Sequence, residues 1–403
     1  MEPLIDIYKR LLNEVFPLYH RTYYDTFHMD HRCIGVVGAR GVGKTTFLLQ
    51  FLRQQYENSD KGLYISADNL YFADHTLIET VDKFVKYYGG ELICIDEIHR
   101  YKNWNQELKN IYDSYPSLKI LFSGSSSIDL IKGKYDLSRR VLLRPLFGFS
   151  FREYLEIQTG KSYPILDIDT IVRNDMKSNI KLETVPKILG HLHQYWENGY
   201  YPTSRSIETY TAFQETLLNI IDKTVYEDIS AFYALKTENI DSLKKIIYFY
   251  ATSEPGTMNI NKLAKSLQKD HATITQYVQI LRDTGLLRFL LINKTGHALV
   301  RNAEKIYLDN TNLLYAINAG IGKEIHIGTV RELFTIQSIE QAAYRVFYSR
   351  DGDICVNNYT FEIGGLSKER TQLKNIENSF VIKDDIVHGS GRSIPLYLFG
   401  FLR

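Results

Sequence analysis

The sequence contains few cysteines and almost no excess of charge. Its three cysteines, Cys33, Cys94 and Cys355, stand far apart with no paired spacing. This distribution excludes a disulfide framework and a zinc knuckle, and it indicates a reducing, cytoplasmic setting. The formal net charge of +1 excludes a strongly basic nucleic-acid coat protein and an acidic solvating protein. Any contact with nucleic acid must therefore come from a local patch.

Long apolar runs are also missing. No run approaches the roughly 20 residues that a membrane-spanning helix needs, so no membrane partner is expected. The first 20 residues mix acids and bases among their apolar positions, which predicts an amphipathic helix and not a secretory signal. At 403 residues the chain is too long for one ordinary core, so two or three domains are expected.

One glycine-rich segment carries a phosphate-binding pattern. Residues 38–45, GARGVGKT, match G-x-x-x-x-G-K-[ST], with a β-branched strand before them and apolar residues at helical spacing after them. Glycines let backbone N–H groups close on phosphate oxygens at a helix N-terminus, Lys44 reaches the outer phosphates, and Thr45 binds magnesium. The residues predicted to contact ATP are Gly38, Ala39, Arg40, Gly41, Val42, Gly43, Lys44, Thr45 and Thr46.

Two adjacent acids, Asp96 and Glu97, end the apolar segment that starts at residue 91. Carboxylates at the mouth of a buried strand are costly without a cation or a chemical task. We expect Asp96 to hold Mg²⁺ through water and Glu97 to polarise the water that attacks the γ-phosphate. The pair therefore predicts ATP hydrolysis as well as ATP binding.

Further strand-like segments complete a predicted parallel α/β sheet in a P-loop ATPase domain, residues 1–155, that includes the N-terminal helix. These segments are residues 62–68, 118–126 and 139–146.

Two kinds of side chain near the later strands are further candidates for the site. Ser123 or its neighbour Ser125 could place a hydroxyl near the γ-phosphate, or both could be turn residues. Arg139 and Arg140 could act on the phosphate of their own or a neighbouring subunit, although a surface ion pair is the commoner role of such residues. The predicted catalytic set is Glu97, Lys44, Ser123 and Arg140.

The order of these motifs resembles a family of bacterial and archaeal AAA-type ATPases. The resemblance covers most of residues 30–155 and is carried by GARGVGKTT, LICIDEIHRYKNWNQELKNI, ILFSGSSSIDL and RRVLLRPLFGFSFREYL. In the last segment the family pattern is matched, with altered spacing at FGF, by Arg140, Pro145, Leu146, Phe151 and Glu153. The resemblance implies the class of P-loop ATPases that has an additional strand and a catalytic glutamate.

The middle of the chain carries no compact chemical motif until residue 256. Apolar positions three and four residues apart predict a helical domain over residues 156–255. Residues 256–299 then predict a winged helix-turn-helix: a short helix, a turn, a longer helix capped by Asp270 and ending near Gly285, and a hairpin wing.

The second helix of this motif would present a polar face without arginine to a DNA groove. The residues on that face are Thr273, Thr275, Gln276 and Gln279. Asp270 and Asp283 oppose the nearby bases, which are Lys262, Lys265, Lys269, Arg282 and Arg288. Winged helices also bind proteins, so the partner is DNA, favoured on the helix-turn-helix analogy, or a protein, including a second copy of the chain.

Three acids near the C-terminus are spaced as in a nuclease core. Glu332 lies in a predicted helix, Asp353 opens a strand and Glu362 ends the next strand, so the three could converge on one metal. Such a core normally has D…E-x-K, but Gly364 stands at the lysine position. Lys368 could substitute only if its loop folds back. Alternatively, Glu332 and Asp353 are buried acids paired with bases.

Residues 300–403 resemble the domain of unassigned function that recurs behind this ATPase family and is itself similar to the PD-(D/E)XK nucleases. The segments FEIGG and PLYLFGFL carry the resemblance, and the matching residues are Glu362, Gly364, Gly365, Lys368 and Gln372. The resemblance implies an α/β restriction-endonuclease-like fold. The missing lysine argues against cutting and predicts a degenerate domain kept for DNA or partner binding.

Together these features predict an ATPase with ATP and Mg²⁺ as cofactors, whose nucleotide state controls the winged helix and the nuclease-like domain. One alternative is a metal-dependent DNA nuclease gated by ATP. Another is a binding scaffold that ATP switches with negligible turnover.

Overall fold

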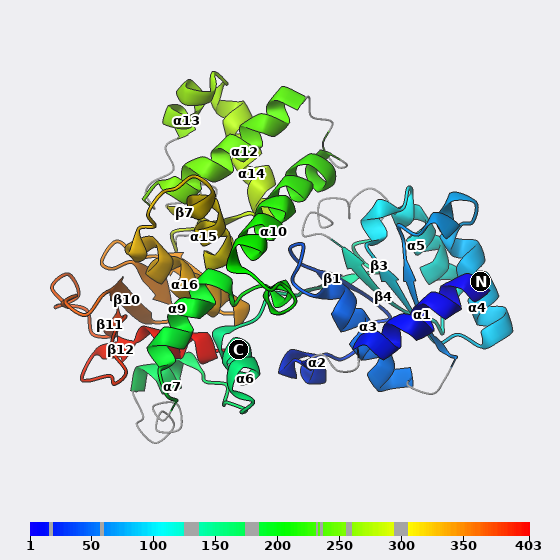
Figure 1. Cartoon of the computed structure of the whole chain (residues 1–403), viewed down its shortest axis with the longest axis horizontal. Coiled ribbons are helices and arrows are strands. Elements are labelled where there is room, and N and C mark those ends of the chain that lie inside the picture. The colour runs from blue at the N-terminus through cyan, green and yellow to red at the C-terminus, as the bar shows by residue number, and fades with distance from the viewer. Residues whose placement is uncertain are drawn as a thin grey trace. The chain divides into compact units, whose positions relative to one another are not determined.

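The computed structural model consists of two compact units, Met1–Phe147 and Gly148–Arg403 (Figure 1). It describes residues 1–15, 19–56, 60–124, 137–173, 185–230, 233, 237–254, 260–293 and 305–403. The boundary expected after residue 155 thus lies inside the second unit. The further division into 156–255, 256–299 and 300–403 stays a prediction.

The first unit contains the predicted parallel sheet, in the order β2-β3-β4-β1-β5. The central position of β4, between β1 and β3, agrees with the additional strand that the resemblance implies. The strands are β1 (Cys33–Val37), β2 (Gly62–Ser66), β3 (Leu92–Asp96), β4 (Lys119–Gly124) and β5 (Leu142–Pro145). The helices are α1 (Glu2–Val15), α2 (Thr22–Thr26), α3 (Lys44–Tyr56), η1 (Leu70–Ala73), α4 (Leu77–Tyr88), η2 (Ile98–Arg100) and α5 (Trp104–Ser114).

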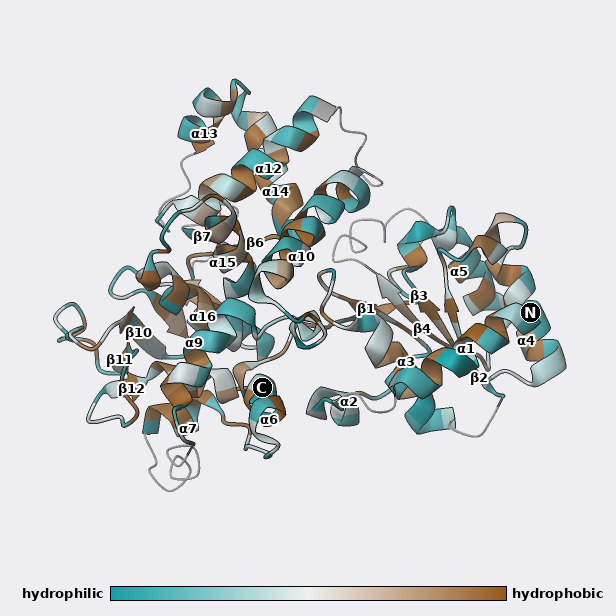
Figure 2. Ribbon diagram, viewed as in Figure 1, coloured by the Kyte–Doolittle hydropathy of each residue, from teal (hydrophilic) through white to brown (hydrophobic). Residues whose placement is uncertain are grey.

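The central strands form a sheet because they are apolar on both faces. Every residue of β1 and β3 is buried, as a parallel sheet covered by helices requires. Figure 2 shows these strands in the hydrophobic colour, with mixed colours on the helices around them. The N-terminal helix is amphipathic, as predicted: Leu4 and Tyr8 are buried where α1 packs against α3 and β2.

The second unit begins with helices and ends with a mixed sheet. Its helices are α6 (Phe151–Thr159), α7 (Ile168–Arg173), α9 (Ile188–Asn198), η4 (Pro202–Arg205), α10 (Tyr210–Lys223), the π-helical η5 (Thr224–Ile229), α12 (Thr237–Thr252), α13 (Ile260–Leu267), α14 (His271–Asp283), α15 (Thr311–Gly320), α16 (Ile327–Gln341) and η7 (Leu396–Phe401). Its strands are β6 (Leu287–Leu290), β7 (Lys305–Leu308), β8 (Val346–Tyr348), β9 (Ile354–Val356), β10 (Tyr359–Gly364), β11 (Ser379–Lys383) and β12 (Ser393–Pro395).

Two parts of this unit bear on function. The helices α13 and α14 are followed by the antiparallel pair β6 and β7, and Asp270 caps α14 as predicted, accepting from the backbone N–H of Thr273. The second sheet has the order β12-β11-β10-β9-β8, antiparallel from β8 to β10 and parallel from β10 to β12, and α16 packs on β8 and β10.

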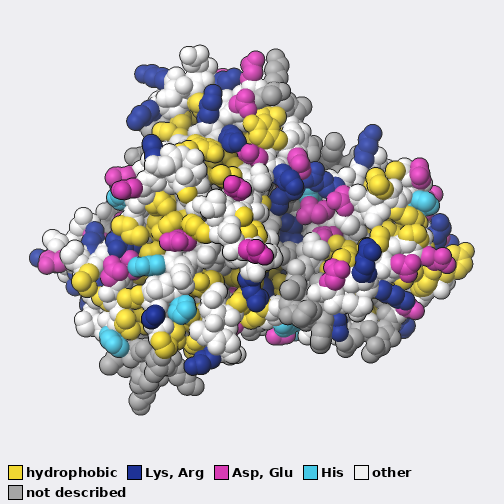
Figure 3. Space-filling model, viewed as in Figure 1, with side chains coloured by type: hydrophobic (Ala, Val, Ile, Leu, Met, Phe, Trp, Pro, Cys, Tyr) yellow, Lys and Arg dark blue, Asp and Glu magenta, His cyan; other side chains and the backbone are white. Residues whose placement is uncertain are grey.

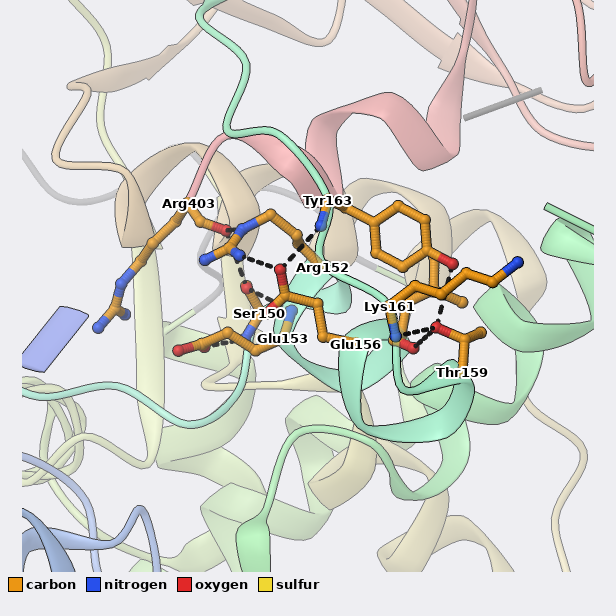
Figure 4. A network of polar contacts seen from close by, with 9 residues as sticks. Ser150, Arg152, Glu153, Glu156, Thr159, Lys161, Tyr163 and Arg403 are labelled. Atoms are coloured by element: carbon orange, nitrogen blue, oxygen red, sulfur yellow. Dashed lines mark hydrogen bonds and ion pairs between the residues drawn. The ribbon is translucent and has the colours of Figure 1, made fainter. Parts of the chain in front are cut away.

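The first helix of the second unit, α6, is tied to residue Arg403 (Figure 4). The carbonyl oxygen of Arg403 accepts from Ser150 Oγ at 3.0 Å and from Arg152 Nε at 2.8 Å. Ser150 and Glu153 form a capping box, and Phe151 packs against η7. Phe151 and Glu153, which match the ATPase family pattern, are therefore part of the fold of the second unit.

Across the described ranges, no helix combines the length and the apolar character that a bilayer crossing requires.

Candidate active site

The glycine-rich loop joins the C-terminal end of β1 to the N-terminus of α3. Gly41 and Gly43 have φ angles of 87° and 97°, in the region that favours glycine. A Cβ atom on Gly38 would collide with the backbone carbonyl of Leu146. Because α3 starts at Lys44, its unpaired N–H groups directly follow the loop, in the arrangement that binds anions.

Lys44 and Thr45 bring this loop together with the two acids of β3. Lys44 is buried, and its Nζ donates to two carbonyl oxygens of the loop, at 3.0 and 3.2 Å. The same atom lies 4.0 Å from Glu97 Oε1. Thr45 Oγ1 donates to Asp96 Oδ2 at 2.6 Å. The prediction that the two motifs meet at one place is confirmed.

Three hydroxyl groups donate to the buried carboxylate of Asp96. Thr45 and Tyr64 donate to Oδ2, the latter at 2.8 Å, and Ser123 donates to Oδ1. Burial, and after it the charge of Asp96, raise the pKa of Tyr64 above its ordinary value, so the tyrosine stays a donor. The site therefore gathers carboxylate and hydroxyl oxygens, and oxygen atoms are the ligands that Mg²⁺ prefers.

Ser123 lies beside Asp96, while its predicted place near the γ-phosphate stays a prediction, and Tyr64 was not predicted. Ser123 is completely buried in β4, beside the strand of the acids, while Ser125 lies outside the described residues. Tyr64 stands on β2 opposite Cys94, two residues before Asp96 on the neighbouring strand. Its position in the strand register was the only signal, and the register requires the order of the strands.

Glu97 leaves β3 in a left-handed backbone conformation, with φ 50° and ψ 41°. Its N–H donates to Ser123 Oγ at 2.9 Å. Its side chain contacts Lys44 on one side and His99 on the other, where His99 Nε2 lies 3.3 Å from Glu97 Oε2. The His99 side chain is only 1% exposed. Sequence reasoning also missed His99, although it follows Glu97 by two positions.

Arg140 lies away from this cluster. It forms a bidentate ion pair with Asp113 near the end of α5, with N···O distances of 2.9 and 3.1 Å. The end of α5 leads into the start of β4, and Arg32, just before β1, donates to the same turn. Arg140 thus lies at the N-terminal ends of the strands, whereas the glycine-rich loop lies at their C-terminal ends. The prediction that it acts on the phosphate of its own chain is wrong in this geometry, and a role toward a neighbouring subunit stays a prediction, as it does for exposed Arg139.

The acids of the second unit are held by lysines. Lys305, the first residue of β7, lies 2.8 Å from Glu332 Oε2 and 3.6 Å from Asp353 Oδ1. The Tyr307 hydroxyl also donates to Glu332, and the Ile363 N–H donates to Asp353 at 2.8 Å. Lys305 was not predicted; it stands on β7, 27 residues before Glu332 and 48 before Asp353 in the sequence. Glu332 and Asp353 are therefore paired with a base, the alternative stated for them.

Glu362 and Lys368 form a second pair. Lys368 Nζ lies 2.8 Å from Glu362 Oε1, while the buried Glu362 Oε2 has no hydrogen-bond partner among the residues that the structure describes. A Cβ atom on Gly364 would overlap the stem of Lys368. Lys368 thus fills the space beside Gly364, because its loop does fold back. Glu362, Lys368 and Gln372 line a pocket of about 410 Å³.

A different set of side chains in the second unit has the spacing of metal ligands. Among the described residues, His193, Asp384 and Asp385 are the group whose ligand atoms all lie within 4.8 Å of one another. However, Arg331 Nε donates to Asp384 at 2.9 Å and Arg331 lies 3.3 Å from Asp385. The carboxylate of Asp384, whose Oδ1 lies 3.7 Å from His193 Nε2, raises the pKa of the histidine above its ordinary value, and burial opposes this effect. The set is an ion-pair network that a cation would have to displace.

The four residues predicted to face a DNA groove, Thr273, Thr275, Gln276 and Gln279, lie on α14. Gln276 and Gln279 are exposed, Thr273 donates to Asp270, and Arg282 stacks over Phe289. Arg288 is buried in ion pairs with Asp309 and Glu340. Two of the five predicted bases, Lys262 and Lys265, are exposed on α13. Figure 3 shows Lys and Arg side chains, with some acids among them, over the end of the second unit where α12 and α13 lie.

Two segments of the chain match models of protein families. Residues 30–155 match the AAA domain, and residues 189–324 match a domain of unknown function, DUF8612. With its strand order and its phosphate-type loop, the first unit thus carries a P-loop domain of the AAA type. The second match crosses the boundaries predicted after residues 255 and 299.

The chain is also similar to one curated protein and to several solved structures. It is 26% identical over 281 residues to the uncharacterized protein MJ1637 of Methanocaldococcus jannaschii, a match that covers 67% of this chain and 59% of the relative. DnaA from Aquifex aeolicus bound to AMPPCP matches 68% of this chain and 86% of its own, with 15% identity and a TM-score of 0.27. PCH-2 of C. elegans matches 68% of this chain and 69% of its own, with 12% identity and a TM-score of 0.25. Scores at this level do not establish a common fold, so the class rests on the strand order and the AAA match.

Proposed function

We propose that the chain is a Mg²⁺-dependent ATPase. The observation that carries the proposal is the 2.6 Å hydrogen bond from Thr45 Oγ1 to Asp96 Oδ2, with Lys44 and Glu97 beside it. A hydroxyl from the helix N-terminus and a strand carboxylate meet at the place where a P-loop holds its metal ion. The loop residues 38–46 bind the phosphates, with Lys44 on the outer ones.

The residues of this chain divide the task of hydrolysis. Bound Mg²⁺ supplies charge neutralisation at the phosphate oxygens. Thr45 and Asp96 hold the ion, and Tyr64 and Ser123 keep Asp96 in place. Glu97 accepts a hydrogen bond from the attacking water and orients it in line with the γ-phosphate, and the Lys44 ammonium compensates the developing negative charge.

ATP turnover with and without DNA tests the proposal and its coupling together. We expect turnover that requires Mg²⁺ and rises when double-stranded DNA is added, because α13 and α14 carry the helix-turn-helix sequence pattern before β6. Turnover that DNA leaves unchanged would favour a protein partner. ATP binding without turnover under any condition would favour the scaffold.

Charge reversal on α13 tests the DNA contact. Lys262→Glu with Lys265→Glu should raise the DNA concentration for half-maximal stimulation by about tenfold and leave basal turnover unchanged, since both lysines are exposed and would face phosphates. Lys119→Glu is the matched control, because Lys119 is an exposed lysine of the first unit, at the start of β4 and at the opposite end of the strands from the loop. Equal stimulation of the double variant and the wild type would contradict the assignment of this face.

A metal-dependent nuclease gated by ATP is the second candidate. It is favoured by Lys368, whose stem covers Gly364 and whose Nζ reaches Glu362, so a lysine stands near the place that the E-x-K pattern requires. Plasmid incubated with Mg²⁺ or Mn²⁺, with and without ATP, would then be cut by the wild type. Asp353→Ala should reduce cutting at least about 100-fold, because a metal-binding acid is lost. Plasmid that stays intact under every condition would remove this candidate.

A further inference from the structure

His99 is buried beside the acid that the proposed reaction needs most. Its side chain is 1% exposed, and its Nε2 lies 3.3 Å from Oε2 of Glu97. An ionised carboxylate only accepts hydrogen bonds, so a ring nitrogen that binds it must carry a proton. The contact is made to the side chain of Glu97, at the end that would face the attacking water.

The backbone of Glu97 is already fixed by other groups. Its N–H donates to Ser123 Oγ at 2.9 Å and to Asp96 Oδ1 at 3.2 Å. Its φ of 50° is unfavourable for a residue other than glycine, and such a conformation persists only where the surrounding contacts hold it. What these bonds leave undetermined is the direction of the side chain. The described contacts of that side chain are to Lys44 and His99.

Lys44 cannot serve both Glu97 and the nucleotide. Its Nζ lies 4.0 Å from Glu97 Oε1 and donates to two loop carbonyls, but a P-loop lysine turns to the outer phosphates once they are present. The interaction of Glu97 with Lys44 then weakens. The contact with His99 does not involve any atom that binds the phosphates.

We infer that His99 is a positioning residue for Glu97: it keeps the carboxylate directed at the attacking water after ATP has taken Lys44. The inference rests on the proposed ATPase function. Because a misplacement of about 1 Å at a reacting group can cost about 100-fold in rate, the loss of His99 should act on the chemical step and not on ATP binding.

The test compares two substitutions at this position by steady-state ATP turnover and by the Kd for ATP. His99→Leu fills the same buried space without a donor, and we expect kcat to fall about 100-fold with KM and Kd within about twofold of the wild type. His99→Gln places an amide N–H near the position of Nε2, and we expect it to keep at least about a third of the wild-type kcat. In a Glu97→Gln background, His99→Leu should slow the reaction no further, because the group it positions is gone.

Each other outcome overturns the inference. A His99→Leu protein with kcat within twofold of the wild type has no positioning role at this residue. Equal losses in the leucine and glutamine variants, with ATP affinity falling in parallel, show a structural role only, and an additive loss in the Glu97→Gln background shows that His99 acts elsewhere. The ATPase proposal fails separately, through a wild type without turnover or a Glu97→Gln variant that matches the wild type, and the inference then fails with it.

Discussion

Glu97→Gln is expected to bind ATP with wild-type affinity and to hydrolyse it about 1,000-fold more slowly. The amide keeps the size of the side chain and its contacts with Lys44 and His99, but it cannot accept a proton from the attacking water. ATP binding is measured by titration calorimetry in the presence of Mg²⁺. Hydrolysis is measured as phosphate release in a single turnover, which separates chemistry from product release.

Glu91→Gln is the matched control for this variant. Glu91 stands just before β3, as Glu97 stands just after it, so the two acids lie at opposite ends of the strand. The exposed carboxylate of Glu91 pairs with Lys61. The control should hydrolyse ATP at the wild-type rate. A Glu97→Gln protein with undiminished turnover would remove the catalytic role of this acid and, with it, the reaction that we propose.

Lys44→Ala is expected to weaken ATP binding about 100-fold and to reduce turnover correspondingly. A charge-assisted hydrogen bond to a phosphate contributes about 1.5–3 kcal/mol, and alanine supplies none. Lys44 is buried and bonded to the loop, so the melting temperature of the variant should be compared with that of the wild type. The loss is expected in ATP affinity even where the fold is retained.

Lys119→Ala controls for the removal of a lysine from the same sheet. Lys119 is exposed at the start of β4, at the opposite end of the strands from the loop, and its removal should leave both affinity and turnover unchanged. If Lys44→Ala binds ATP as tightly as this control, the loop does not hold the outer phosphates as proposed. If both variants lose affinity equally, the effect is a general one of charge.

The sequence predicted the site best where the functional residues are consecutive or nearly so. Residues 38–45 and the pair Asp96 and Glu97 each combine a local pattern with a local chemical requirement, so the glycine loop, the helix start and the acidic strand end could all be placed. The sheet followed from the spacing of apolar segments, and all five expected strands are present in the first unit. Asp270 as the cap of α14 is a further local prediction that the structure confirms.

Sequence reasoning failed where a side chain is defined by a partner from elsewhere in the chain. Arg140 was a candidate because it precedes a strand, with a surface ion pair as the stated alternative, and its guanidinium pairs with Asp113 of α5. Phe151 and Glu153 fall within the AAA-domain match, and in the structure they belong to α6, where Glu153 completes a capping box with Ser150 and Phe151 is buried. A sequence motif gives the order of its residues, but it does not give the direction of their side chains in the fold.

The nature of the nucleotide site was thus decided by short segments of sequence, because a phosphate loop and an acidic strand end are built from neighbouring residues. Its supporting contacts were decided by the tertiary structure. Tyr64 reaches Asp96 only because β2 lies next to β3 in a particular register, and His99 meets Glu97 only because the chain turns sharply after β3. In the second unit, Lys305 reaches Glu332 and Asp353 through strand β7, so a cluster that the sequence predicts as a metal site is held by an ammonium group. Distances between side chains depend on how strands and helices pack, and no local pattern records that packing.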